Sequence, residues 1–151
     1  MPFHQYLTPE LVRFVVSQFK LSHSGVHGPS HWMRVRRNGL ELAEKTGANT
    51  GVVELFALFH DSCRVNEDTD HGHGLRGADL AQQCFDEGLL TCSLDDLKLL
   101  KVACQQHTGG TYAPSNDSNL LGRRQVGLAK GLYSSQTTIT LYCVCERPYY
   151  D

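Results

Sequence analysis

The sequence predicts an all-α helical bundle over residues 1–110, followed by an irregular or β-prone tail over residues 111–151. Apolar residues recur at helical spacing in several segments before residue 107, and capping residues or glycines stand at the segment ends. After residue 107 the helical periodicity stops, and residues 137–145 are rich in β-branched residues with little charge. The total of 151 residues suits one domain with a buried core.

The composition excludes several classes of protein. With 40% hydrophobic and 20% charged residues, the chain is not expected to be disordered throughout. A formal net charge of -2 argues against a protein dedicated to nucleic-acid binding. The sequence shows neither a membrane-span pattern nor a secretory signal pattern, so we expect no membrane association and a cytoplasmic location.

The first two helices are predicted from their ends. Thr8, followed by Pro9, is a typical helix start, and apolar residues then recur to about residue 19. A loop rich in Ser, Gly and His precedes a second helix, which is expected from near Ser30 to Gly47. We expect Trp32, in this helix, to pack into the core.

Residues 52–59 are almost wholly apolar and are compatible with a buried strand or a buried helix. Apolar positions on every side and the lack of a neighbouring strand signal favour a central helix. A polar loop over residues 66–74 separates it from helices predicted at residues 75–89 and 93–107. The second of these opens with Ser93-Leu94-Asp95-Asp96, which is expected to act as a capping box. The sequence contains six cysteines, and we expect those within the helical part to be reduced thiols: Cys63, Cys84, Cys92 and Cys104. The Cys143/Cys145 pair is a weak metal signal by itself.

The pair His60-Asp61 is the strongest candidate for chemistry. It ends the run of apolar residues, where burying an imidazole and a carboxylate is costly unless something pairs with both. A divalent metal ion would do so, because both groups are good ligands for first-row cations. By contrast, we expect Asp68 and Asp70 to be turn residues, and three further histidines to be solvated: His4, His23 and His71.

The order of His31 followed by His60-Asp61 after an apolar helix resembles the HD-domain superfamily of metal-dependent phosphohydrolases. The resemblance covers roughly residues 20–110 and tightens to a small bacterial HD-domain group. It is carried by His27-Gly28-Pro29-Ser30-His31-Trp32, Arg34-Val35, Asn38-Gly39, Leu55-Phe56-Ala57-Leu58-Phe59-His60-Asp61-Ser62-Cys63-Arg64, Asp70, His73-Gly74, Arg76, Ala103-Cys104 and His107-Thr108.

This resemblance implies a set of site residues and a reaction. His31, His60 and Asp61 would bind a divalent metal ion (Mn, Mg, Fe, Zn, Ni or Co) that activates water for attack on a small phosphorylated compound, nucleotides included. The residues expected to contact substrate are Arg64, Arg76 and His27. Arg64 is also expected to assist catalysis, and His73 and His107 are expected either to act as acid catalysts or to orient the metal ligands. A salt bridge is the alternative for Arg64. The three histidines outside the ligand set are equally compatible with loop or capping roles.

The family's last ligand is missing from this sequence. It would be an aspartate after His107, in a segment resembling Cys-Trp-Asp-Ala-Asp-Arg-Leu. Residues 120–126 can be encoded by codons that give this segment when read one base later. Our hypothesis is a frameshift between about His107 and Asn116, which would make the tail an atypical and partly disordered polypeptide.

The missing aspartate leaves three functions open. The first is a metal-dependent phosphohydrolase with weakened metal affinity. The second is a non-catalytic HD-like module that binds a ligand or a protein. The third is a helical interaction domain that needs no metal.

Overall fold

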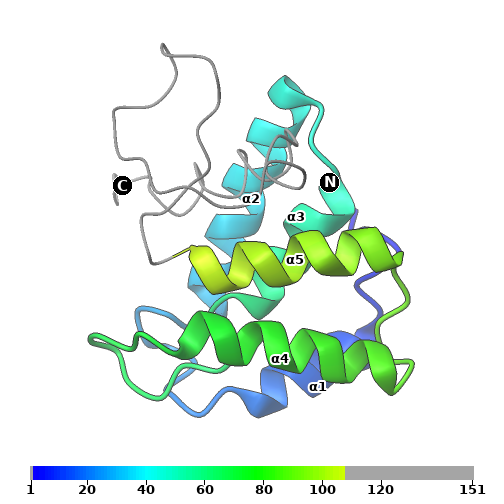
Figure 1. The fold of residues 1–151 in the computed structure, drawn as a ribbon. Coiled ribbons are helices and arrows are strands. Elements are labelled where there is room, and N and C mark those ends of the chain that lie inside the picture. The colour runs from blue at the N-terminus through cyan, green and yellow to red at the C-terminus, as the bar shows by residue number, and fades with distance from the viewer. Residues whose placement is uncertain (1, 108–151) are drawn as a thin grey trace.

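The structure, a computed structural model, describes residues 2–107 (Figure 1). Within this range it contains helices and no strand, which confirms the all-α prediction for this part of the chain. The helices are α1 (Pro9–Gln18), α2 (Pro29–Thr46), α3 (Thr50–Phe59), α4 (His73–Asp86) and α5 (Leu94–Gln106). The predictions for the tail, for Cys143 and Cys145 and for the frameshift after His107 fall outside the described residues.

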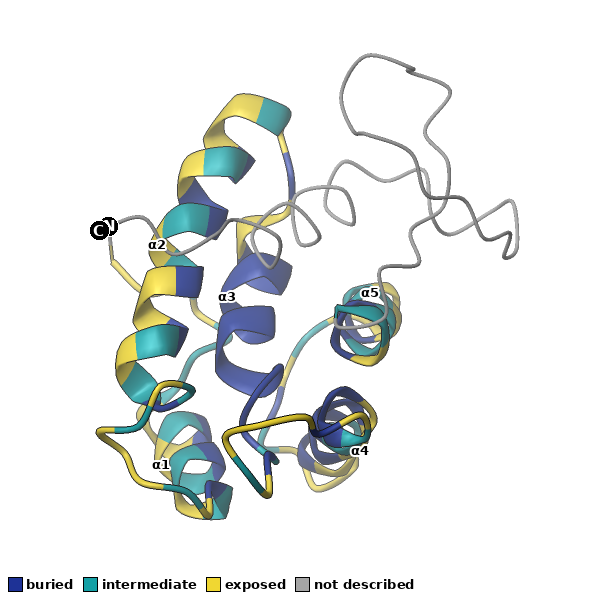
Figure 2. Ribbon diagram, turned by 90° about the vertical axis from the view of Figure 1, so that its left-hand side faces the viewer, coloured by how far each residue is buried: buried dark blue, intermediate teal, exposed yellow. Residues whose placement is uncertain are grey.

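Helix α3 is the centre of the fold. Every residue from Gly51 to Phe59 is buried, and the helix contacts α1, α2, α4 and α5 (Figure 2). A helix that is apolar on every side has no face suited to water, so it packs inside the others. The prediction of a central helix at residues 52–59 is therefore confirmed.

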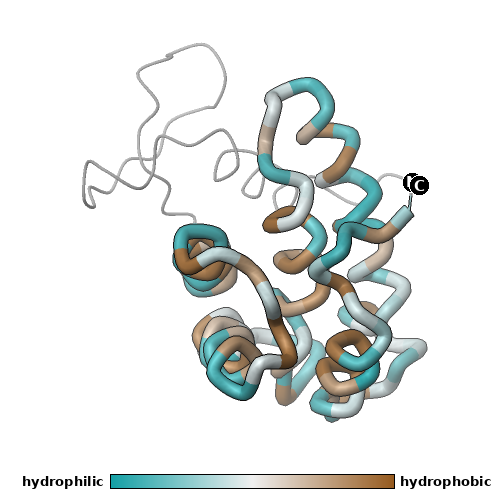
Figure 3. Tube along the Cα trace, turned by 90° about the vertical axis from the view of Figure 1, so that its right-hand side faces the viewer, coloured by the Kyte–Doolittle hydropathy of each residue, from teal (hydrophilic) through white to brown (hydrophobic). Residues whose placement is uncertain are grey.

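The other helices of the described part pack around α3. α2 packs along α3, and α4 packs against α5 on the opposite side (Figures 1 and 2). Hydrophobic and hydrophilic residues alternate along these outer helices, as expected for helices with one buried face (Figure 3). Trp32 of α2 is 5% exposed, and its ring packs edge-to-face against that of Phe19 with ring centres 5.2 Å apart. Its predicted packing role is therefore confirmed.

Most helix ends follow the predicted signals. Thr8 accepts a hydrogen bond from the amide of Leu11, and Ser93 accepts one from the amide of Asp96. Gly47 ends α2 with a φ of 72°, a left-handed conformation that favours glycine. These three local signals needed no tertiary information.

The start of α4 differs from the prediction. The helix begins at His73 rather than near Leu75, so His73 and Gly74 belong to its first turn and not to the polar loop. A Cβ atom at Gly74 would lie 2.0 Å from the carbonyl oxygen of Cys104. The glycine that looked like a loop residue is thus what lets α4 approach α5.

The four cysteines within residues 2–107 are free thiols, as predicted. Burial raises the pKa of Cys84 and of Cys92 to about 11, so both thiols are protonated at neutral pH. No helix in the described part of the chain is long and apolar enough to cross a membrane.

Candidate metal centre

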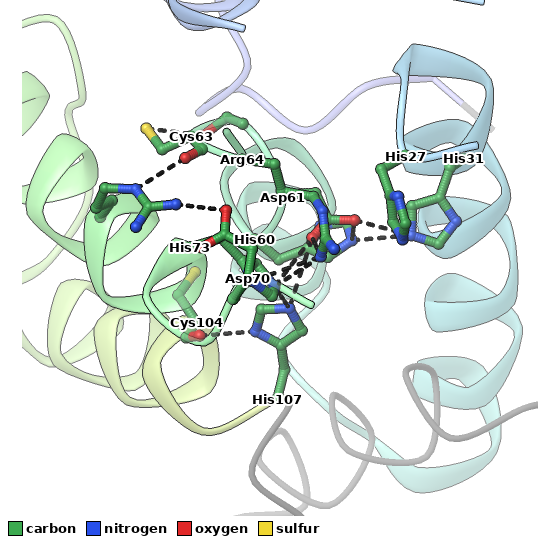
Figure 4. Close-up of polar contacts among 12 residues, drawn as sticks. His27, His31, His60, Asp61, Cys63, Arg64, Asp70, His73, Cys104 and His107 are labelled. Atoms are coloured by element: carbon green, nitrogen blue, oxygen red, sulfur yellow. Dashed lines mark hydrogen bonds and ion pairs between the residues drawn. The ribbon is translucent and has the colours of Figure 1, made fainter. Parts of the chain in front are cut away.

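Helix ends bring four histidines to a single buried aspartate (Figure 4). His31 lies in the first turn of α2, and His60 and Asp61 directly follow the last residue of α3. His73 is the first residue of α4, and His107 follows the last residue of α5. Asp61 is 2% exposed, so these side chains surround a negative charge that is shielded from water.

We call His31, His60 and Asp61 the first cluster. The Nε2 atoms of the two imidazoles lie 3.2 Å apart, and each lies 3.4 Å from Asp61 Oδ2. In the plane of these three atoms, the point equidistant from all of them is about 1.9 Å from each. This is close to the roughly 2.0–2.2 Å bonds that imidazole and carboxylate form with zinc. The structure thus brings the three predicted ligands together at a spacing that suits a metal ion.

We call Asp61, His73 and His107 the second cluster, which uses the other oxygen of the same carboxylate. Asp61 Oδ1 lies 3.2 Å from His73 Nε2 and 3.7 Å from His107 Nε2, and the two Nε2 atoms are 2.9 Å apart. Their equidistant point is again about 1.9 Å from each atom, by the same geometry. Asp61 therefore connects two groups of donor atoms, each able to hold one metal ion.

Backbone carbonyl groups orient three of the four imidazoles. His60 Nδ1 lies 3.1 Å from the carbonyl oxygens of both Phe56 and Ala57. In the same way, His73 Nδ1 contacts the carbonyl oxygen of Asp70, and His107 Nδ1 lies 2.7 Å from that of Cys104.

A carbonyl oxygen only accepts hydrogen bonds, so each of these Nδ1 atoms carries a proton. In the neutral imidazole the other ring nitrogen, Nε2, then presents a lone pair, which is the form that a metal ion binds. The Nε2 atoms of His73 and His107 lie 2.9 Å apart, close enough for one cation to contact both. The donor set and its orientation therefore fit a divalent metal ion in each cluster.

The charge states also suit metal binding. Burial lowers the pKa of His60 to about 3, although Asp61 next to it opposes this shift. Burial would raise the pKa of Asp61, but His60 and hydrogen bonds from His107, His31 and His73 outweigh burial and hold this pKa below its ordinary range. At neutral pH, His60 is neutral and Asp61 is ionised, which are the forms that bind a metal.

Arg64 reaches the clusters, although it does not extend into solvent. Its side chain is 7% exposed, and its Nη1 atom lies 3.4 Å from Asp61 Oδ1. Its Nε and Nη2 atoms donate to the carbonyl oxygens of Asn66 and Asp68. The predicted substrate-binding role thus falls on a guanidinium group whose three nitrogens already have partners within the protein.

Arg76, the other arginine predicted to hold phosphate, binds the loop between α3 and α4. Its Nη2 atom lies 2.5 Å from Asp70 Oδ2, and its Nε atom donates to the carbonyl oxygen of Cys63. Asp70 also accepts from the amide of Val65, and these contacts hold its pKa at about 2 although burial opposes the shift. Asp70 therefore orders the loop, as expected for a turn residue.

His27, predicted at the mouth of the site, lies beside the first cluster. Its ring centre is 5.9 Å from that of His31, and its Nδ1 atom lies 2.6 Å from Glu67 Oε2. The pair connects the loop before α2 to the loop after α3. Of the three histidines expected to be solvated, His23 and His71 are exposed, whereas His4 is half-buried.

Sequence reasoning missed the partner of His27 and the full set of donor atoms that could hold a metal ion. Nothing near Glu67 marks it as the partner of a histidine 40 residues away. His73 and His107 were assigned to catalysis because no sequence rule gives their distance from Asp61. The one available signal was that the resemblance already included both histidines.

Comparisons of the chain with protein-family models, with curated proteins and with solved structures find no match.

Proposed function

We propose that this chain is a metal-dependent phosphohydrolase of the HD-domain type that acts on a small phosphorylated compound, nucleotides included. The observation that carries the proposal is the pair of clusters joined by Asp61. Imidazole and carboxylate ligands suit Mn, Fe, Co, Ni or Zn, and a two-metal site stabilises the attacking and leaving oxygens in phosphoryl transfer. The resemblance of residues 20–110 to the HD superfamily supports the same reaction.

The chain's own residues would position the reacting groups. Bound divalent ions supply a lowered pKa for a coordinated water and offset negative charge on phosphate. Asp61 would hold both ions through its two oxygens, and the backbone carbonyl contacts of His60, His73 and His107 would keep their Nε2 atoms directed at the ions.

The burial of the ligands indicates the side from which substrate enters. The side chain of His31 is 19% exposed, whereas those of His60 and His73 are 2% exposed and that of His107 is 6% exposed. Substrate would therefore enter from the His31 side, past the pair formed by His27 and Glu67. Because so little of the centre is exposed there, a small phosphate ester suits it better than a polymer. A cytoplasmic location is part of this proposal, since the four described thiols are free.

A screen of phosphate esters with added divalent metal ions tests the proposal. We expect the wild-type chain to release phosphate only with metal, and the His60→Ala/Asp61→Ala variant to lose this activity. A His71→Ala variant, which alters an exposed histidine, should keep wild-type activity. Hydrolysis that survives in the double variant would contradict the proposed site. Metal binding without hydrolysis of any ester would favour the non-catalytic HD-like binding module instead.

A further inference from the structure

We propose that Arg64 acts as a built-in cation of the second cluster, so that the second cluster binds metal more weakly than the first. The protein would then hold one ion tightly and exchange the other. This inference rests on the proposed metal centre and concerns its stoichiometry.

The position of the guanidinium group is the first step. Arg64 Nη1 lies 3.4 Å from Asp61 Oδ1 and 3.2 Å from His73 Nε2, which are two of the three donor atoms of the second cluster. It is also 3.4 Å from His73 Nδ1, so it is nearly equidistant from the two ring nitrogens. Such a nitrogen lies over the ring face and not along the Nε2 lone pair. Arg64 therefore leaves that lone pair available, and what it opposes is the charge of a second ion.

The charge of Arg64 is fixed in place. An arginine side chain stays protonated at any pH at which proteins fold. Its Nη2 atom donates to the carbonyl oxygen of Asp68 at 2.7 Å and its Nε atom to that of Asn66 at 3.3 Å, and the side chain is almost completely buried. The guanidinium group therefore keeps its charge, and it can move away from the second cluster only by breaking these contacts. Repulsion between cations is strong in such a poorly solvated position.

The two clusters are therefore unequal, although both use Asp61. Arg64 contacts Oδ1, which belongs to the second cluster, whereas His31 and His60 contact Oδ2. An ion in the second cluster would share its carboxylate oxygen with a guanidinium group at 3.4 Å. Occupancy of the second cluster, and any activity that needs both ions, would then follow the free metal concentration.

Titration of the metal-free protein with Mn²⁺, followed by calorimetry, tests the inference. For the wild type we expect one tight site and a second site at least about tenfold weaker, from the repulsion between cations. In Arg64→Gln, whose amide can still donate to a loop carbonyl, the second site should become at least about tenfold tighter while the first is unchanged. Arg64→Lys keeps the charge and should keep the second site weak.

Two further variants identify the site and the cause. Arg76→Gln removes a guanidinium group that binds the same loop through Asp70 and Cys63, and it should leave both affinities at wild-type values. Adding His107→Ala to Arg64→Gln should abolish the gained site. Circular dichroism of each metal-free variant checks that it folds.

The outcomes separate this inference from the proposed function. Two equally tight sites in the wild type would overturn the role of Arg64, even if Arg64→Gln failed to fold. A second affinity that is unchanged in Arg64→Gln, or raised equally in Arg64→Lys, would also overturn it and leave the metal centre intact. A wild-type protein that binds no Mn²⁺ would contradict both proposals together.

Discussion

At the scale of single residues, a buried metal site needs His60 to be neutral and the neighbouring Asp61 to be ionised, and the fold provides both charge states. An imidazole that is 2% exposed stays neutral, and the carboxylate next to it stays ionised because the surrounding imidazoles contact it. Their adjacency at the end of an apolar run was enough to predict a metal site from the sequence. The positions of His73 and His107 beside Asp61 were not predictable in this way, because contacts formed only in the folded chain, with the carbonyl groups of Asp70 and Cys104, orient their rings.

The neutral state of His60 predicts how stability depends on pH. Its pKa is about 3 in the folded protein and near 6.5 in the unfolded chain, so the unfolded state binds one more proton between these values. The stability due to this group is fully present above about pH 6.5. It falls by about 1.4 kcal/mol per pH unit as the pH drops toward 3. The pKa of Asp61 is also lowered, so its contribution is lost only below its ordinary value near 4.

Urea denaturation of the metal-free protein at pH 6.5 and pH 5 measures this effect. Between these pH values, the free energy of unfolding should fall by about 2 kcal/mol more in the wild type than in His60→Gln, whose side chain does not titrate. His71→Gln, at an exposed position, should lose as much as the wild type. Equal losses in the wild type and in His60→Gln would show that His60 is not held neutral.

At the scale of the helices, the sequence predicted which segments are helical but not how their ends meet. The caps at Thr8, Gly47 and Ser93 depend on neighbouring residues, and all three were predicted. The start of α4 depends on Gly74 lying against the carbonyl of Cys104, 30 residues away, so sequence reasoning placed the start two residues late. The second cluster depends on this close approach, since His73 begins α4 and His107 follows α5.

Helix α3 carries one charged residue within its apolar sequence, and this residue fixes the N-terminal segment. Glu54 is 2% exposed, forms an ion pair with Arg36 of α2 at 2.5 Å, and accepts from the amide of His4 at 2.5 Å. It also lines a cavity of about 590 Å³, whose lining includes none of the residues of the two clusters. The Glu54–Arg36 pair therefore joins α3 to α2 and to the segment before α1, and its role is to stabilise the fold.

Substitution of Glu54 should destabilise the fold because it removes the negative charge that pairs with Arg36 in a buried position. We expect Glu54→Gln to lower the free energy of unfolding by about 3 kcal/mol, as is typical when one partner of a buried ion pair is removed. Glu41→Gln, which alters an exposed pair with Lys45 on α2, should change it by less than about 0.5 kcal/mol. Urea denaturation measures both values, and similar small effects would show that the buried pair contributes little.

At the scale of the whole molecule, the candidate centre is a contact between helices that are distant in the sequence. His31 and His107 lie 76 positions apart in the sequence, so the site exists only when α2, α3, α4 and α5 are packed together. The sequence predicted the fold class, and the family resemblance pointed to the three residues of the first cluster. The sequence did not supply the second cluster, since neither helical periodicity nor motif spacing gives the distance between two helix ends. The prediction that a family ligand is missing concerns residues beyond those described.

The metal content of the purified protein tests the central claim most directly. Elemental analysis after loading with divalent metal should find at least about one equivalent in the wild type and none in Asp61→Asn, which removes the shared charge from both clusters. Asp70→Asn is the matched control, because the side chain of Asp70 is also a buried carboxylate but contacts Arg76 and the amide of Val65. Its contact with His73 is made by the backbone carbonyl, which the substitution keeps. This variant should keep its metal. An Asp61→Asn protein that binds as much metal as the wild type, or a folded wild type that binds none, would contradict the account.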